Sequence, residues 1–306
     1  MKKILVIGAS GFIGGYLTNQ LLAEGYTVRC LARSPEKLKG LAERGCEIVK
    51  GDFTDPTSVQ NALDSIDAVY VSIHTLAPQN KSTANQGFMD IEMDALKNIV
   101  KGCKVHGIHR LIYVTAIGIT ADAKDTWNLG RWKTQQYLLN SGLNVTVIQP
   151  GMIVGISGQG FNMVLANAKK SFAIVIGNGK NKFRSIAIDD LVYNLIGVLN
   201  EPKAFGKCYE VGSDDVLTGN QLIDEAADVL NNPHPRKIHI PLGILRLIAP
   251  LIERITKSPK GAIRGAIGGI GADLIGDSSA IRKLLARQPL NYKQAVLQAL
   301  EVYNRK

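Results

Sequence analysis

The sequence predicts an α/β protein built on a doubly wound parallel sheet, with a smaller mixed lobe toward the C-terminus. Short apolar runs alternate with amphipathic stretches over the first half of the chain, and a glycine-rich turn follows the first run. Repeated strand–helix units of this kind favour a parallel sheet covered by helices on both faces. The rhythm stops after Pro150-Gly151. We therefore predict a first domain over 1–155 and a second lobe over 156–306, with segments of the lobe returning to the first sheet.

The predicted strands are nearly continuous apolar runs, which is typical of a parallel sheet buried on both faces. They lie at 3–8, 27–32, 46–50, 67–73, 109–115 and 144–149. The segments between them predict helices at 12–24, 35–44, 56–63, 85–106 and 127–141. Ser34-Pro35 and Asp55-Pro56 agree with two of these helix starts, because each places a capping side chain before a proline at the first helical position.

The second lobe has a different pattern. The glycine-rich polar segment 155–160 predicts a loop, and the apolar runs on either side of Gly177-Asn178-Gly179 predict a β-hairpin. These two predicted strands are 174–176 and 183–188. A helix should begin at Ile188. Thr218 and Gln221 have the spacing of a capping box before a helix at 222–230.

Composition excludes several classes of protein. The 306 residues are 45% apolar, enough for a large core, and we find no uninterrupted apolar stretch of about 18 residues, so we predict no membrane span. The four cysteines are scattered without a C-x-x-C pair, which is typical of buried residues in a reduced cytoplasmic protein. They are Cys30, Cys46, Cys103 and Cys208. We predict no metal site.

The net charge of +10 favours anionic partners, such as a phosphorylated cofactor, an acidic substrate or an anionic membrane. We find neither a helix-turn-helix pattern nor an aromatic-basic platform, so we do not expect nucleic acid to be a partner. The sequence leaves the oligomeric state open.

Three glycines, Gly8, Gly11 and Gly14, follow the first predicted strand directly and lead into the first predicted helix. Glycine allows a tight turn in which backbone N–H groups approach a pyrophosphate, and the helix N-terminus adds partial positive charge. A glycine triplet is informative when it stands between a strand and a helix, as it does here. We therefore predict a dinucleotide-phosphate site whose residues are Gly8, Ser10, Gly11, Phe12, Ile13 and Gly14.

The G-x-x-G-x-x-G spacing, together with the rest of the chain, resembles the extended and atypical short-chain dehydrogenase/reductases, and most closely their NmrA-like, NAD(P)H-binding branch. The resemblance covers most of the chain and is most specific over the first 155 residues or so. It implies a Rossmann-type domain that binds a nicotinamide dinucleotide, and a variable second lobe that takes a small-molecule substrate.

The position about 20 residues past the glycines selects between NAD and NADP in such folds. An acid there binds the ribose 2′-hydroxyl of NAD, but this chain has Arg33, with Lys37 one helical turn further on. A guanidinium pairs well with the 2′-phosphate of NADP. We therefore predict NADP(H), with NAD(H) the less favoured cofactor.

The resemblance assigns further cofactor contacts at the ends of the later strands. Asp52 and Phe53 would contact the adenine, and the end of the fourth strand would face the ribose or the substrate, because ligands bind at the carboxyl ends of parallel strands. The remaining candidates are Ser72, His74, Pro150, Gly151 and Ile153.

The resemblance also predicts a catalytic hydroxyl after the fifth strand and a Tyr-x-x-x-Lys motif on the next helix. Thr115 supplies the hydroxyl, and Lys133 is the lysine that we match to the motif. The residue four positions earlier is Leu129, so the catalytic tyrosine is missing. Our candidate catalytic residues are Lys133 and Thr115, which would also contact the cofactor.

Two interpretations follow from the missing tyrosine. In one, apolar neighbours enclose Lys133 and allow it to act as general acid and base in an NADP(H)-dependent reductase of a small, hydrophobic carbonyl or conjugated substrate. Isoflavone-reductase-like relatives also work with a lysine and no tyrosine. In the other, the protein binds NADP(H) without catalysis, as NmrA-type regulators and the accessory reductase-like subunit of respiratory complex I do.

A basic amphipathic stretch lies near the C-terminus. Residues 241–287 contain eight Lys or Arg and three Asp or Glu, a net charge of +5. A basic amphipathic helix can lie on an anionic membrane or pack against its own protein, and the second is the usual arrangement. We therefore expect Ile248, Leu251 and Ile255 to be buried against the second lobe.

Replacing Arg33 with Asp should shift the cofactor preference from NADP(H) to NAD(H). The carboxylate would repel the 2′-phosphate and accept a hydrogen bond from the 2′-hydroxyl. Calorimetric titration of both proteins with both cofactors measures the change. A wild-type protein that binds NAD(H) at least as tightly as NADP(H) would contradict the prediction.

Overall fold

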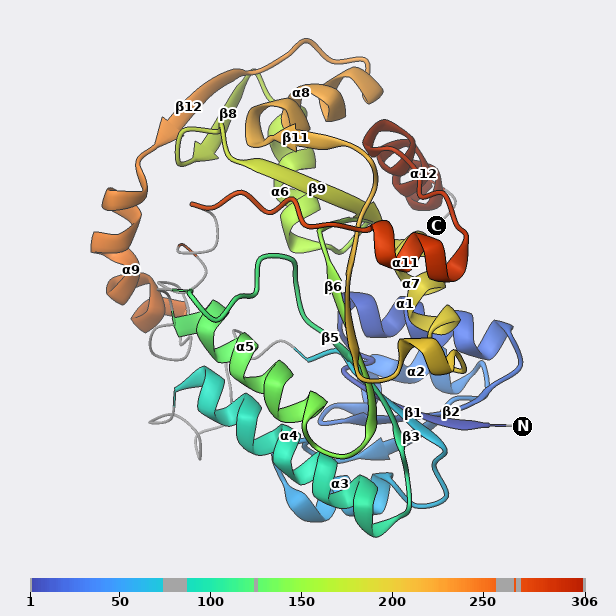
Figure 1. The fold of residues 1–306 in the computed structure, drawn as a ribbon. Helices are drawn as coiled ribbons and strands as arrows, with labels where there is room; N and C mark the ends of the chain where they lie inside the picture. The colour runs from blue at the N-terminus through green and yellow to red at the C-terminus, as the bar shows by residue number, and fades with distance from the viewer. Residues whose placement is uncertain (1, 74–86, 124–125, 257–266, 268–270, 305–306) are drawn as a thin grey trace.

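A parallel sheet of seven strands forms the centre of the computed structural model, which describes residues 2–73, 87–123, 126–256, 267 and 271–304 (Figure 1). The strand order is β10-β6-β5-β4-β1-β2-β3. The strands are β1 Lys3–Ile7, β2 Thr27–Ala32, β3 Glu47–Lys50, β4 Ala68–Val71, β5 Arg110–Val114, β6 Asn144–Pro150 and β10 Lys207–Val211. The chain winds from β1 to β3 in one direction and from β4 to β6 in the other, which confirms the doubly wound Rossmann-type α/β fold.

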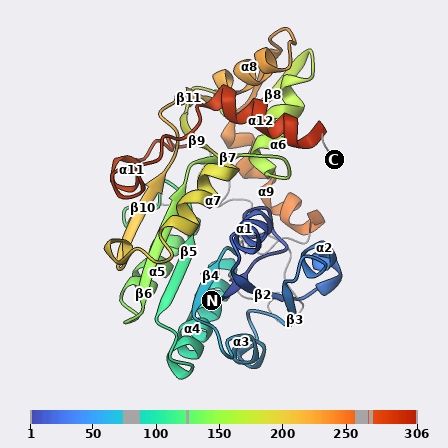
Figure 2. The same cartoon turned by 90° about the vertical axis from the view of Figure 1, so that its right-hand side faces the viewer.

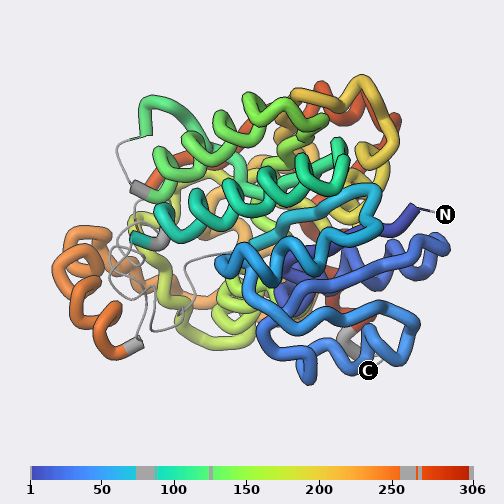
Figure 3. The backbone as a smooth tube through the Cα atoms, turned by 90° about the horizontal axis from the view of Figure 1, so that it is seen from below, coloured from blue at the N-terminus to red at the C-terminus, as the bar shows by residue number. Residues whose placement is uncertain are grey.

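Helices cover both faces of this sheet. Alternating side chains of β1 serve both cores, because Ile4 and Val6 join one hydrophobic cluster while Leu5 and Ile7 join the other. The first face carries α1 Phe12–Ala23, η1 Pro35–Leu38, α2 Lys39–Ala42, α7 Ile188–Gly197 and α11 Ser279–Leu285. The second carries α3 Pro56–Ala62, α4 Phe88–Val105 and α5 Thr126–Leu139. Figure 2 shows α1 and α7 across the sheet from α3 and α4, and Figure 3 shows α4 and α5 side by side.

The second lobe contains two small sheets, β11-β9-β7 and β12-β8. Its strands are β7 Met152–Val154, β8 Phe172–Ile176, β9 Lys182–Ala187, β11 Val216–Thr218 and β12 Arg236–Ile240. Its helices are α6 Gln159–Ala168, α8 Gly219–Val229, α9 Leu242–Thr256 and α12 Tyr292–Asn304. The short helix η3 Pro202–Ala204 belongs to the central domain, since Ala204 joins the core of the first face. Two segments from this half of the sequence return to the central sheet, since β10 pairs with β6 and α7 packs on α1.

The hairpin predicted around Gly177-Asn178-Gly179 is wrong. β8 pairs in parallel with β12, whereas β9 pairs with β7 and β11. Gly177 and Gly179 do adopt positive φ angles, of 79° and 68°, but the turn carries the chain from one small sheet to the other. The Gly177 N–H donates to the Ile240 carbonyl at 2.8 Å, so a strand far along the sequence takes the place of the local partner.

Two of the three predicted helix caps are confirmed. The Asp55 carboxylate accepts hydrogen bonds from the backbone of Thr57 and Ser58, and Thr218 and Gln221 form a complete capping box. Ser34 precedes the short helix η1, but its side chain makes no capping hydrogen bond. The predicted helix at 35–44 is accordingly divided between η1 and α2.

Two predictions of burial are also wrong. Ile248, Leu251 and Ile255 are exposed, because α9 contacts the rest of the protein through the side that carries the fully buried Ala249. Cys208 is exposed on β10, an edge strand, whereas Cys30, Cys46 and Cys103 are buried. All four thiols are free. In the described part of the chain, no helix has both the length and the hydropathy of a membrane span.

A buried carboxylate joins the C-terminal segment to the central domain. Asp190, in the first turn of α7, is 1% exposed. One of its oxygens accepts from Arg287 Nε at 2.8 Å, and the other accepts from the Leu290 N–H at 2.8 Å. The Arg287 guanidinium also lies over the Tyr193 ring, 4.3 Å from its centroid. These contacts hold the start of the last helical segment beside α7.

Replacing Asp190 with Ala should lower the free energy of unfolding by about 2–3 kcal/mol, because charge-assisted hydrogen bonds are lost and the Leu290 N–H is left unpaired. Urea denaturation measures the change. Asp214→Ala is the matched control, since Asp214 also binds an arginine, Arg282, but is exposed. This control substitution should lower the free energy of unfolding by about 1 kcal/mol or less. Equal effects of the two substitutions would contradict this account.

Candidate functional site

The residues predicted to bind a cofactor come together at one edge of the central sheet. Because the seven strands are parallel, their carboxyl ends meet at this edge, where ligands bind in open α/β sheets. β1 ends at the glycine turn, β2 ends before Arg33, β4 ends before Ser72, and β5 ends before Thr115. His74 lies outside the described residues.

The glycine turn brings β1, α1 and the end of β4 into contact that no larger residue allows. Gly8 has a φ angle of +102°, and a Cβ atom on it would lie 2.1 Å from the Ser72 carbonyl oxygen. A Cβ atom on Gly14 would lie 2.2 Å from the Gly8 carbonyl oxygen. The Gly11 N–H donates to that same oxygen at 2.9 Å, which closes the turn. Only glycine at positions 8 and 14 therefore allows the backbone segments to approach this closely.

The N-terminus of α1 has the features of an anion site. Gly11 is the N-cap residue, so no side chain caps the helix, and the first turn carries no acidic residue. The first-turn N–H groups of a helix lack intrahelical acceptors and attract negative charge. Ser10 is exposed beside this turn, and Ile13 is half-buried within it. A dinucleotide pyrophosphate fits the donors that this segment presents.

Phe12 joins the glycine turn to the second lobe. Its ring lies against the glycine-rich segment after β7: a Cβ atom on Gly155 would be 2.8 Å from the ring, and one on Gly158 would be 2.9 Å from it. On its other side the ring meets Tyr16 edge-on, with centroids 5.5 Å apart. The cofactor turn is thereby packed directly against the loop that opens the second lobe.

The residues predicted for the adenosine end lie beyond β2 and β3. Arg33 and Lys37 are exposed, as a contact with an incoming phosphate requires. Asp52 and Phe53 are half-buried. One Asp52 oxygen accepts from the Thr54 N–H at 2.9 Å and from its hydroxyl at 2.8 Å, which fixes the orientation of the carboxylate.

Thr115 is held in place by its backbone and carries an unused hydroxyl. Its N–H donates to the Ile148 carbonyl at 2.9 Å, so the residue continues the alignment of β5 with β6. Its Oγ1 atom is buried without a hydrogen-bond partner among the described residues. A buried hydroxyl without a partner costs free energy, and such atoms in native proteins call for an explanation such as a ligand.

The end of β6 forms the junction between the two lobes. The Ile117 N–H donates to the Pro150 carbonyl at 3.0 Å, and the Gly151 N–H donates to the Val211 carbonyl at 3.0 Å. A Cβ atom on Gly151 would lie 2.2 Å from the Arg184 carbonyl oxygen, so β9 crosses here in close contact. Ile153 is half-buried and packs against the core of the central domain.

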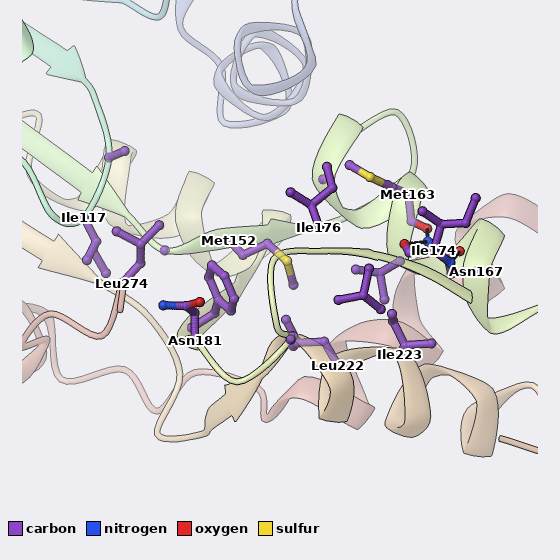
Figure 4. Close-up of a pocket in the computed structure, with 18 of the residues that line it drawn as sticks. Ile117, Met152, Met163, Asn167, Ile174, Ile176, Asn181, Leu222, Ile223 and Leu274 are labelled. Carbon is purple, nitrogen blue, oxygen red and sulfur yellow. Dashed lines mark hydrogen bonds between the residues drawn. The ribbon is translucent and has the colours of Figure 1, made fainter. Parts of the chain in front are cut away.

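A cavity of about 340 Å³ lies between the segments that follow β5 and β6 and the second lobe (Figure 4), and Ala116, the residue after Thr115, is part of its lining. It is lined mainly by apolar side chains, and its few polar groups include the amides of Asn167 and Asn181. Figure 4 shows Ile117 and Leu274 at one end and Met163 and Ile174 at the other. The lining also includes Ala116, Met152, Ile176, Phe183, Leu222 and Ile223. Its size and lining suit a small apolar ligand.

A buried ion pair lies on the inner side of α5. Arg131 Nη1 is 3.2 Å from Glu92 Oε1, and both side chains are almost completely inaccessible. Arg131 also donates to the Tyr113 hydroxyl at 2.9 Å, and Tyr113 in turn donates to Glu92. The guanidinium lies 5.8 Å from the Trp127 ring centroid. This cluster links α4, α5 and β5.

The surroundings of Tyr113 and Arg131 keep both side chains protonated near neutral pH. Burial raises the pKa of Tyr113, and Arg131 only partly offsets this effect, so the phenol remains protonated near neutral pH. Burial by itself would lower the pKa of Arg131, but Glu92 and Tyr113 more than offset it, and the net pKa is raised. Neither group is suited to exchange a proton with a substrate.

Residues 8–173, more than half of the chain, match the NAD(P)H-binding family. The protein belongs to this family of atypical short-chain dehydrogenase/reductases. The match begins at the glycine turn and ends at the start of β8, so it includes the carboxyl ends of β1 to β6 but not β10.

Two relatives illustrate the range of this family. The chain is 27% identical over 263 residues to the mitochondrial NADH dehydrogenase [ubiquinone] 1 alpha subcomplex subunit 9 of Arabidopsis thaliana; the match covers 83% of this chain and 64% of that protein, so it spans less than two thirds of that relative. It is 23% identical over 296 residues to the NAD(P)H azoreductase of Xenophilus azovorans, covering 96% and 90%.

Among solved structures, the Escherichia coli NADPH-dependent quinone oxidoreductase in complex with NADPH superposes with a TM-score of 0.73. The superposition covers 97% of this chain and 99% of that one at 17% sequence identity. At this identity the likeness supports the fold alone.

The family's Tyr-x-x-x-Lys motif has no direct counterpart on the buried side of α5. One pair with i,i+4 spacing there is Trp127 and Arg131, with the guanidinium 5.8 Å from the ring centroid. Lys133 is exposed, so the apolar enclosure expected around it is not found. The catalytic role assigned to Lys133 remains a prediction.

Sequence patterns alone do not reveal the Arg131–Glu92 pair, because charged residues on amphipathic helices usually face solvent. The helical spacing of the residues around Arg131 does indicate which side of α5 is buried. Arg131, Thr134, Gln135 and Leu138 recur at the spacing of a buried helix face, and all four are buried. That register places Arg131 inward and Lys133 outward.

Replacing Arg131 with Met should lower the free energy of unfolding by about 3–5 kcal/mol, because it leaves the Glu92 carboxylate buried without its cation. Lys133→Met, two positions away and exposed, should change it by about 0.5 kcal/mol or less. Urea denaturation measures both.

The double variant Glu92→Leu/Arg131→Met should recover most of the lost stability, since removing both charges leaves no unpaired ion. A double variant no more stable than Arg131→Met, or a loss in Lys133→Met as large as in Arg131→Met, would contradict the assignment of this pair.

Proposed function

We propose that the protein is an NADP(H)-dependent reductase of a small, apolar, conjugated acceptor of the quinone class. The observation that carries this proposal is the apolar cavity beside Thr115, whose buried hydroxyl has no hydrogen-bond partner among the described residues. Ala116, the residue after Thr115, lines this cavity. An apolar cavity next to a residue with a spare hydrogen-bond donor suits a ligand that is mostly hydrophobic and has one oxygen to accept a hydrogen bond.

The cofactor would be held by residues from both ends of the dinucleotide site. The N-terminus of α1 would bind the pyrophosphate, and Arg33 and Lys37 would pair with the 2′-phosphate. Asp52 and Phe53 would contact the adenine, and Ser72 would add a further contact at the end of β4. When bound, NADPH would supply a hydride.

Thr115 would orient the acceptor by donating a hydrogen bond to its oxygen. A conjugated acceptor fits this site better than a simple ketone, because its reduced anion is delocalised and can take a proton from water without a protein acid. Tyr113 is committed to Glu92, and Lys133 lies on the exposed side of α5. We therefore revise the proton-transfer role assigned to Lys133 and propose that the proton comes from solvent.

The relatives support this class of reaction without establishing it. An azoreductase and a quinone oxidoreductase both reduce conjugated acceptors, and the first aligns with nearly the whole chain. The free thiols fit a protein of the reducing cytoplasm, which is where we place the reaction.

A second candidate is an NADP(H)-binding protein without catalysis that serves as a regulator, an assembly factor or an accessory subunit. The observation that favours it is the Trp127–Arg131 pair, which stands at the spacing of the family's catalytic pair and offers no proton donor. Similarity to a complex I subunit agrees with this candidate.

A screen of quinones, azo compounds, enones and ketones for oxidation of NADPH distinguishes the two candidates. We expect turnover with conjugated acceptors and little with ketones. Calorimetric binding of NADPH without turnover of any acceptor would reject the reductase and favour the second candidate.

Thr115→Val should lower kcat/KM for the acceptor by about ten- to a hundredfold, because it removes a hydrogen bond to the reacting oxygen. The same substitution should leave the melting temperature unchanged or raise it, since the lost hydroxyl is buried and unpaired. Steady-state kinetics and differential scanning calorimetry measure the two effects. Unchanged kinetics, or a loss of activity that follows a loss of stability, would contradict the role of Thr115.

A further inference from the structure

Helix α9 presents an apolar strip to solvent. Five large side chains of this helix are 42–81% exposed: Ile244, Leu247, Ile248, Leu251 and Ile255. At 3.6 residues per turn they fall within about a third of the circumference. Ala249, on the opposite side, is fully buried, so the helix is attached to the protein by the side that faces away from this strip.

The charge around this strip is positive. Arg246 and Arg254 are exposed on α9, and helical spacing places Arg254 at the edge of the strip, next to Leu247. The sequence from the start of this helix to residue 266, 241–266, contains five Lys or Arg and one Glu, a net charge of +4. An exposed apolar strip beside basic residues is the pattern of helices that lie in the interface of an anionic bilayer, with the apolar side chains among the acyl chains and the cations near the headgroups.

The first turn of α9 lies close to the apolar cavity. Leu242, the first residue of α9, is a neighbour of Gly177, which directly follows the cavity residue Ile176. Met163 and Ile174 line the cavity and are also 50% and 54% exposed. Ile238 on β12 pairs with Ile174 and is 52% exposed. Figure 1 shows α9, β12 and β8 along one side of the second lobe.

We propose that α9 docks this protein on the surface of an anionic lipid bilayer. The five apolar side chains enter the interface, and the basic residues bind the headgroups. Docking in this way brings the mouth of the cavity close to the lipid, from which an apolar ligand would enter. The docking does not depend on catalysis, so it stands or fails separately from the proposed reductase activity.

Sedimentation with vesicles tests the proposal. The full chain should bind vesicles that contain phosphatidylglycerol and bind pure phosphatidylcholine vesicles much more weakly. Raising the salt from about 0.1 M to about 1 M, which shortens the Debye length from ~10 Å to ~3 Å, should weaken the binding. Leu247→Asp should reduce binding by about tenfold or more, because one leucine no longer enters the apolar phase.

Leu297→Asp is the matched control, since Leu297 is an exposed leucine on α12. It should leave vesicle binding unchanged. Both variants should melt within a few degrees of the wild type, as expected for exposed positions.

Three outcomes would overturn the proposal: no binding to phosphatidylglycerol vesicles, equal losses in the two variants, or a marked loss of stability in Leu247→Asp. Self-association of the wild type that Leu247→Asp abolishes, without vesicle binding, would show instead that the strip joins two copies of the chain. Activity plays no part in these measurements, so a failed substrate screen leaves their interpretation unchanged.

Discussion

The contact between the glycine turn and the end of β4 determines the position of everything else at the candidate site. Gly8 and Gly14 leave no room for a Cβ atom, so β1, α1 and β4 approach as closely as their backbones permit. This approach aims the N-terminus of α1 along the carboxyl edge of the sheet. Phe12, in the first turn of α1, then packs against Gly155 and Gly158, which fixes the second lobe relative to the turn.

The cluster of Arg131, Glu92 and Tyr113 shows how a family scaffold can keep its shape while its chemistry changes. The cluster connects α4, α5 and β5, and the raised pKa values of Tyr113 and Arg131 keep both of these groups protonated near neutral pH. Such a cluster supports the geometry of the pocket but supplies no proton. This is why the reductase that we propose takes its proton from solvent.

The second lobe combines two surfaces of similar chemistry. The inner surface is the apolar cavity beside Thr115, and the outer surface is the apolar strip of α9. The elements that carry them are neighbours at Gly177, where β8 ends and Leu242 begins α9. Joining a hydrophobic cavity to an exposed hydrophobic strip costs solubility, so we interpret the arrangement as serving a ligand that itself prefers an apolar phase.

The sequence by itself determined the central domain, because its signals are local. Apolar runs mark the buried strands, Asp55 and the pair of Thr218 and Gln221 cap their helices through neighbouring backbone groups, and the glycines of the turn act within seven residues. The same local signals also predict that most of the cofactor residues lie at one edge of the sheet, because these residues follow strands that are parallel and therefore end at the same edge.

The tertiary structure alone decided the features that depend on distant partners. The expected hairpin gave way to pairing of β8 with β12, because a strand some sixty positions later supplies the hydrogen bonds. The inward position of Arg131 depends on Glu92 from another helix. The apolar side of α9 faces solvent because the helix attaches through Ala249. Amphipathic spacing shows that a helix has an apolar side, but only the packing of the folded chain decides whether that side meets protein or solvent.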